Sequence, residues 1–125
     1  MKFSHKYIIV GAGSAGCVLA NKLSEDPKNS VLLIEAGPLD SSYSIKMPLA
    51  ASSLFKSKKY GWGYETEPEK NLNNRTINWP RGKTLGGSSS INGMLYVRGQ
   101  ADDYDKWGKL GNNGWGYRDL LKYFI

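Results

Sequence analysis

A glycine-rich turn set between an apolar run and a helical pattern constrains this chain most strongly. The segment Gly11–Gly16 reads GAGSAG and directly follows the β-branched run Tyr7–Val10. Residues 14–24 then carry an apolar stripe at helical spacing, and residues 30–35 form a second short apolar run. A strand, a glycine turn, a helix and a second strand in this order predict a βαβ unit with two parallel strands.

The spacing of the three glycines is that of a dinucleotide-binding turn. Gly11 permits the tight turn, Gly13 lets a pyrophosphate approach the backbone, and Gly16 lets the helix pack close to the strand. The start of the helix would offer free N–H groups to the phosphates. Glu35 ends the second strand, where a carboxylate binds ribose hydroxyls and repels a 2′-phosphate. The pattern favours NAD or FAD over NADP, and the alternative is a glycine turn without a ligand.

A second glycine-rich segment, Arg81–Gly99, sets the chain apart from a plain NAD-binding domain. It reads RGKTLGGSSSINGMLYVRG, and it follows some 45 residues without regular strand–helix alternation. We expect Ser88–Leu95 to begin a helix, so that Gly86 and Gly87 expose a second set of N–H groups to an anion. Asn92 and Gly93 would then present an amide and a bare backbone to a flat ring. The alternative is a serine-rich surface loop.

The rest of the chain is predicted to be loop-rich, with short helices. The expected elements are a short helix at Pro48–Phe55, a loop at Lys56–Gly63, a turn-rich stretch at Thr66–Asn74, an edge strand at Arg75–Trp79, and helices at Ala101–Leu110 and Tyr117–Ile125. The last helical pattern reaches the final residue without a stop signal, so we expect the chain to be the front part of a longer protein.

Charge and cysteine content limit the classes of partner. The formal net charge is +6, but the basic residues are scattered, and the tightest group is Lys56, Lys58 and Lys59. We therefore expect a solvated basic surface, no nucleic-acid partner and no metal site. The single cysteine, Cys17, excludes an internal disulfide and fits a reducing compartment. No apolar run is long enough for a membrane helix, and we expect a cytoplasmic protein, with peripheral association at the inner membrane as the alternative.

The two glycine segments together resemble the N-terminal part of the glucose–methanol–choline (GMC) flavoprotein oxidoreductases. The residues similar to that family's first signature are Gly82, Lys83, Leu85, Gly86, Gly87, Ser88, Ser89, Ile91 and Asn92, then Tyr96, Gly99 and Asp105. The resemblance runs from Tyr7 to Phe124 and is strongest to the choline dehydrogenase and bacterial alcohol dehydrogenase branch. It implies an α/β fold, in which residues 1–125 form a Rossmann-like FAD-binding βαβ unit with loop-rich and helical additions, as an incomplete domain.

The resemblance also implies FAD as cofactor and assigns residues to it. The pyrophosphate would be bound by Gly11, Gly13, Ser14, Ala15 and Gly16, and the adenosine ribose by Glu35 next to Ala36. The diphosphate and ribityl part would lie near Thr84, Gly86, Gly87 and Ser88. The isoalloxazine would lie near Asn92, Gly93, Met94 and Leu95, with contributions to the site from Trp62 and Arg81. Members that tether FAD through a histidine carry it at the position of Ile91. Isoleucine cannot form that bond, so we expect non-covalent FAD.

The implied reaction is oxidation of a primary alcohol, choline-like or other, to the aldehyde, with hydride transfer to FAD. The electron acceptor is either oxygen or a respiratory acceptor. No residue matches the family's catalytic histidine, because the single histidine, His5, precedes the first motif. We expect the substrate-binding domain and the catalytic part to be absent, and this chain alone to be inactive. Two alternatives stay open: an NAD-dependent dehydrogenase domain, and a non-catalytic nucleotide-binding remnant.

Overall fold

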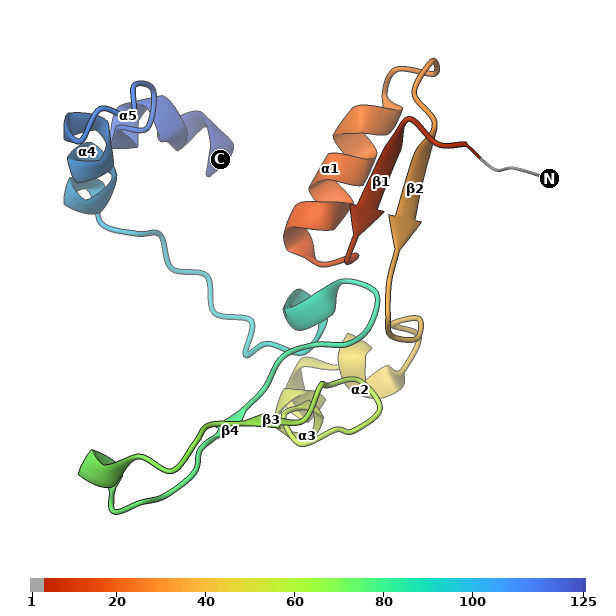
Figure 1. Ribbon diagram of the computed structural model, residues 1–125, viewed down its shortest axis with the longest axis vertical. Helices are drawn as coiled ribbons and strands as arrows, with labels where there is room; N and C mark the ends of the chain where they lie inside the picture. The colour runs from red at the N-terminus through yellow and green to blue at the C-terminus, as the bar shows by residue number, and fades with distance from the viewer. Residues whose placement is uncertain (1–3) are drawn as a thin grey trace. The chain divides into compact units, whose positions relative to one another are not determined.

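The computed structural model describes residues 4–125 (Figure 1). The chain divides into two compact units, Met1–Met94 and Leu95–Ile125. The first unit contains both glycine segments as far as Met94. Its longest helix, α1, has 11 residues. Across residues 4–125, no helix has the length and apolar character needed to cross a membrane.

The first unit begins with the predicted strand–helix–strand arrangement. Strand β1 (Tyr7–Val10) pairs in parallel with β2 (Val31–Ile34), with Tyr7 opposite Val31 and Val10 opposite Ile34. Helix α1 (Ser14–Ser24) connects them and runs beside the pair (Figure 1). The parallel strands and the bounds of the helix are confirmed. β2 ends one residue before Glu35, which therefore stands at the carboxyl end of the sheet.

The two-stranded sheet is covered by α1 on one face. Burial alternates along β1, so that Tyr7 and Ile9 are partly buried while Ile8 and Val10 remain 60% and 83% exposed. Because side chains alternate between the faces of a strand, Ile8 and Val10 lie on the face away from the helix. An apolar sheet face left open among the described residues agrees with a partial α/β domain.

Short elements fill the segment between the glycine segments. Helix α2 (Tyr43–Lys46) leads to a 3-10 helix at Pro48–Ala50 and then to α3 (Ala51–Leu54), close to the predicted short helix. Strand β3 (Tyr64–Glu65), which the sequence did not predict, pairs antiparallel with β4 (Asn78–Trp79), and a 3-10 helix covers Lys70–Leu72. The predicted edge strand was too long, since Arg75 forms only an isolated bridge with Glu69.

The predicted helix at Ser88–Leu95 is wrong. The chain forms one 3-10 helix at Gly87–Ser90 and then continues without regular structure to residue 100. Asn92 explains the break, because its side-chain oxygen accepts the N–H of Met94 at 2.9 Å, an alternative to the helical hydrogen bond. Met94 also adopts φ +57, outside the right-handed helical region.

A small core supports the second glycine segment. Leu54, Tyr60 and Ile91 are buried together, and Ile45 packs against them. These residues come from α2, α3, the loop before β3 and the end of the 3-10 helix at Gly87–Ser90. Ile91 therefore anchors the middle of the second glycine segment to the irregular part of the same unit.

The second unit is a pair of helices joined by aromatic packing. Helix α4 (Ala101–Lys109) confirms the prediction to within one residue, whereas the predicted last helix divides into α5 (Tyr117–Leu120) and a 3-10 helix at Leu121–Tyr123. The ring of Tyr104 lies 5.2 Å from that of Trp107 and 5.6 Å from that of Phe124, between centroids. The Arg98 guanidinium donates to the Phe124 carbonyl and to the hydroxyl of Tyr96, and the hydrogen bond to Tyr96 raises the pKa of Arg98.

Candidate cofactor site

The two glycine segments interlock at the carboxyl end of the parallel strands. The N–H of Gly86 donates to the carbonyl oxygen of Ala12 at 2.7 Å. A Cβ on Gly87 would lie 2.9 Å from the Cα of Gly13, and a Cβ on Gly82 would overlap the Gly87 carbonyl. Both segments therefore form one surface, with no room at these contacts for a side chain.

The three glycines of the first turn are required for different reasons. Gly11 has φ +97, a conformation that favours glycine. A Cβ on Gly16 would overlap the carbonyl oxygen of Gly11, so the close approach of α1 to the turn excludes any side chain there. Gly13 has an ordinary backbone conformation, and no atom lies within 4 Å of its Cβ position. The open space beside Gly13 is what a pyrophosphate close to the backbone would need.

The start of α1 offers hydrogen-bond donors to this open space. Gly13 is the N-cap residue and supplies no side-chain cap to the first turn of the helix. The first N–H groups of a helix lack intrahelical partners, and the dipole places partial positive charge there. An anionic group beside Gly13 would thus meet donors from Ser14 and Ala15.

Glu35 links the ends of the two parallel strands. Its Oε2 accepts the N–H of Ala12 at 2.8 Å, and its Oε1 accepts the N–H of Gly37 at 2.9 Å. The carboxylate is half-buried, and each of its oxygens can accept a further hydrogen bond. Glu35 is therefore a structural link between the two strand ends, and its carboxylate keeps capacity to accept hydrogen bonds from a ligand.

Two adjacent hollows lie on this surface and share Val10, Gly11, Gly13 and Ser88. The one on the Glu35 side has a volume of about 450 Å³ and includes Ala36, Trp62 and Gly82. The one on the helix side, also about 450 Å³, reaches over the start of α1. Together they gather these predicted site residues: Gly11, Gly13, Ser14, Ala15, Gly16, Glu35, Ala36, Gly87 and Ser88.

Other predicted site residues line neither hollow. Thr84 is fully buried, and its hydroxyl donates to the Pro38 carbonyl, so that hydroxyl is engaged within the chain. Gly86 is half-buried, and its N–H is bound to the carbonyl oxygen of Ala12. The exposed residues that the resemblance placed near the flavin ring are absent from both linings: Asn92, Gly93, Met94 and Leu95.

Some residues that line the hollows were not predicted from the sequence. Val10 and Ile34 are the last residues of the two strands, and both are exposed. Val10 could have been found from the sequence, because it is the apolar residue directly before the glycine turn and ligands bind at the carboxyl ends of parallel strands. Gly82 belongs to the family signature but was given no cofactor role, and its close contact with the Gly87 carbonyl accompanies its place in the wall.

Positive charge is held beside the Glu35-side hollow. The Lys83 ammonium lies 4.7 Å from the centroid of the Trp62 ring, and Trp62 forms part of the wall. A cation over an aromatic face is held by the ring quadrupole. A basic side chain in this place favours an anionic ligand.

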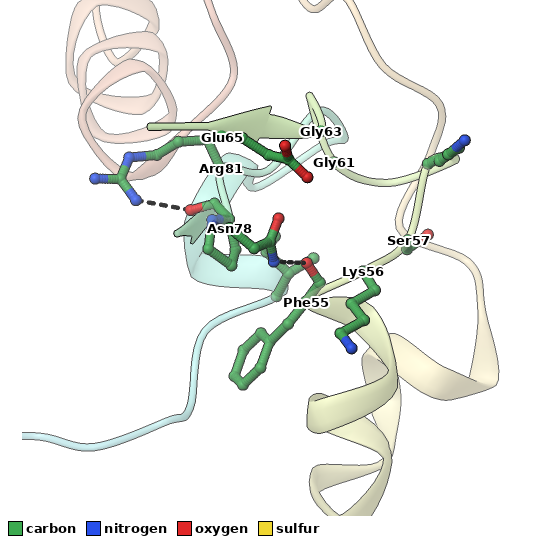
Figure 2. Close-up of a pocket in the computed structure, with 11 residues that line it drawn as sticks. Phe55, Lys56, Ser57, Gly61, Gly63, Glu65, Asn78 and Arg81 are labelled. Atoms are coloured by element: carbon green, nitrogen blue, oxygen red, sulfur yellow. Dashed lines mark hydrogen bonds between the residues drawn. The ribbon is translucent and has the colours of Figure 1, made fainter. Parts of the chain in front are cut away.

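A third hollow of about 420 Å³ lies between the end of α3 and the β3–β4 pair (Figure 2). Arg81, which the resemblance placed near the cofactor, lines this hollow instead. Its guanidinium donates to the Pro80 carbonyl at 2.7 Å, and the Asn78 amide donates to the Phe55 carbonyl at 3.1 Å (Figure 2). The side chains of Arg81 and Asn78 are therefore engaged by backbone carbonyls.

The histidine lies away from the hollows. His5 precedes β1, at the end opposite the glycine turn, and its Nδ1 lies 2.8 Å from the Ser30 hydroxyl. Among residues 4–125, no three His, Cys, Asp or Glu side chains are grouped to hold a metal ion. Among the described residues, the single histidine therefore lines neither of the two hollows at the glycine segments.

The family model for GMC oxidoreductases matches residues 5–125. An oxygen-dependent choline dehydrogenase of Rhizobium etli is 58% identical over 118 residues, which are 94% of this chain and 22% of that protein. The crystal structure of pyridoxine 4-oxidase from Mesorbium loti is 41% identical, with a TM-score of 0.90, over 97% of this chain and 24% of that chain. An FAD-dependent oxidoreductase from Chaetomium thermophilum is 43% identical, with a TM-score of 0.81, over 98% and 20%. The chain spans about a fifth of the length of these relatives.

Proposed function

Because the chain belongs to the GMC oxidoreductase family, we propose that it is the FAD-binding N-terminal part of a flavoprotein that oxidises a primary alcohol to the aldehyde. On this proposal residues 1–125 form part of a Rossmann-like FAD-binding domain. The observation that carries it is the interlock of Gly86 and Gly87 with Ala12 and Gly13 around two adjacent hollows. A single glycine turn serves many nucleotides, whereas two joined glycine segments suit a longer dinucleotide.

The proposal assigns the pyrophosphate to the open side of Gly13. The uncapped start of α1 would donate to it, and the close packing of Gly16 keeps the helix near enough to do so. Gly87 and Ser88 form the facing wall of the same space. These residues bind and orient the cofactor without taking part in proton transfer.

Glu35 is proposed to receive the adenosine ribose. Its carboxylate is held by two backbone N–H groups, and it lines the hollow together with Ala36. A carboxylate in this place accepts ribose hydroxyls and repels a 2′-phosphate. This supports FAD or NAD over NADP, and the FAD named for the Chaetomium thermophilum relative supports FAD.

The isoalloxazine is proposed to lie near Asn92, Gly93, Met94 and Leu95, and to be held without a covalent bond. The side chain at the tether position, Ile91, is an alkyl group buried against Leu54 and Tyr60. It has no nucleophile to offer to the flavin. Bound FAD would supply the hydride acceptor for the alcohol carbon.

The alcohol proton needs a base, and the proposal places that base outside these 125 residues. His5 lies at the far end of β1 from the cofactor surface. The chain's own part is to fix the cofactor and to shield its pyrophosphate. A choline-like substrate is supported by the name of the Rhizobium etli relative, which also points to oxygen as the electron acceptor. A place in the cytoplasm or at the inner membrane surface, and the lack of a nucleic-acid partner, stay predictions.

One experiment separates this proposal from the two alternatives. The protein is purified as its gene encodes it, its visible spectrum is recorded, and choline or another primary alcohol is added without oxygen. A flavin spectrum that bleaches with alcohol supports the proposal. Bound NAD without flavin would support an NAD-dependent domain, and bound flavin that no alcohol bleaches would support a non-catalytic remnant.

A further inference from the structure

Thr84 is the largest fully buried side chain among the described residues, at 0% exposure. Its hydroxyl donates to the carbonyl oxygen of Pro38 at 2.8 Å, and the N–H of Leu85 donates to the same oxygen at 3.0 Å. Pro38 belongs to the loop that follows β2. Thr84 therefore ties the second glycine segment to the loop that carries Glu35.

The connection continues from Pro38 to the Glu35 carboxylate. A Cβ on Gly37 would overlap the backbone carbonyl of Lys83, so the two loops touch along their main chains. The N–H of Gly37 donates to Oε1 of Glu35, and Oε2 of Glu35 accepts the N–H of Ala12. The Thr84 hydroxyl and the Glu35 carboxylate thus belong to one continuous network of backbone contacts.

We infer that Thr84 is a positioning residue that holds the Glu35 carboxylate in place to receive the ribose of a dinucleotide. This rests on the proposed FAD site. A hydrogen bond fixes direction as well as distance, and its loss would let the Gly37–Pro38 loop shift while the apolar packing of Thr84 remains. Thr84 itself does not touch the cofactor on this account, which replaces the role that the resemblance gave it.

The test is the FAD dissociation constant of Thr84→Val, measured by flavin fluorescence on the protein as its gene encodes it. Valine keeps the shape and removes the hydroxyl. The variant should fold, because the Pro38 carbonyl keeps the Leu85 N–H as a donor. We expect the dissociation constant to rise by about three- to tenfold. Thr84→Ser, which keeps the hydroxyl and loses the methyl group, should bind FAD like the unchanged protein.

A double-mutant cycle with Glu35→Gln distinguishes a Thr84 that positions the Glu35 carboxylate from a Thr84 with a purely structural role. If Thr84 acts through the Glu35 carboxylate, Thr84→Val should change the dissociation constant by less than about twofold in the Glu35→Gln background. Additive effects, equal losses in Thr84→Ser and Thr84→Val, or unchanged binding in Thr84→Val would each overturn the inference. Should Thr84→Val fail to fold, the comparison of Thr84→Ser with Thr84→Cys, a weaker donor, decides in the same way. If the unchanged protein itself binds no FAD, the proposed function fails instead, and this inference fails with it.

Discussion

Gly13 and Gly87 lie against each other, so that a Cβ on Gly87 would come within 2.9 Å of the Gly13 Cα. This contact joins the turn after β1 to the segment that leads into the 3-10 helix at Gly87–Ser90. Both residues line the hollow on the Glu35 side. The shape of the candidate cofactor site therefore depends on the absence of side chains at this point.

Replacement of Gly87 by alanine should destabilise the protein. The residue has φ +59 and no free space toward Gly13, so alanine would meet both backbone strain and a clash. We expect the free energy of unfolding to fall by about 1–3 kcal/mol, measured by urea denaturation. Gly108→Ala is the matched control, because Gly108 lies inside α4 with only ordinary contacts, and alanine should keep or raise stability there. Equal changes in the free energy of unfolding for Gly87→Ala and Gly108→Ala would contradict the close contact of Gly87 with Gly13.

Gly13 and Gly16 should respond differently to alanine. At Gly13 the Cβ position is open and φ is −80, so Gly13→Ala should lower the stability of the cofactor-free protein by only about 1 kcal/mol, the cost of a poorer N-cap residue. The added methyl group would stand where the pyrophosphate approaches, and the FAD dissociation constant should rise on the order of tenfold or more.

Gly16→Ala should instead damage the fold. The added Cβ would overlap the Gly11 carbonyl oxygen, so α1 would have to move away from the turn. We expect both the unfolding midpoint and the FAD affinity to fall, measured by thermal denaturation and flavin fluorescence. Unchanged stability in Gly16→Ala, or a loss in Gly13→Ala as large as that in Gly16→Ala, would show that the turn has been misassigned.

The strand, turn and helix were predictable because their signals are local. The apolar run Tyr7–Val10, the spacing of the glycines and the stripe along α1 all lie within one short stretch, and the helix has the predicted bounds. The sequence also placed the first turn and Glu35 directly after the ends of the two strands, as the structure has them.

The contacts between segments distant in the chain could not be predicted from local sequence patterns. The close approach of Gly37 to Lys83, and that of Gly82 to Gly87, depend on chain packing and leave no local pattern. The predicted helix after Gly87 failed for a different reason. The side chain of Asn92 competes for the backbone N–H of Met94, an interaction that helical periodicity does not register.

Glu35→Gln should weaken FAD binding. The amide keeps one acceptor oxygen, whereas the carboxylate serves the Ala12 and Gly37 N–H groups and is proposed to serve the ribose as well. We expect the dissociation constant to rise about tenfold, measured by titration of the cofactor-free protein with FAD. Glu65→Gln, in the exposed β3 strand, is the control and should bind FAD unchanged. The assignment of Glu35 fails if the two variants bind equally well.

The flavin should leave the protein on acid precipitation. Ile91 is buried against Leu54 and Tyr60 and offers no atom that could bond to the flavin. All flavin absorbance is expected in the supernatant after denaturation and centrifugation. Flavin fluorescence retained by the precipitated polypeptide would contradict non-covalent binding.

If the two glycine segments bind FAD, the cofactor-free protein should take up FAD in a direct titration. FAD and NAD are added in parallel, and binding is followed by quenching of flavin fluorescence and by calorimetry. We predict saturable binding of FAD at one site, weakened on the order of tenfold or more in Gly13→Ala, with much weaker binding of NAD. Tighter binding of NAD than of FAD, or FAD binding that Gly13→Ala does not change, would contradict the claim.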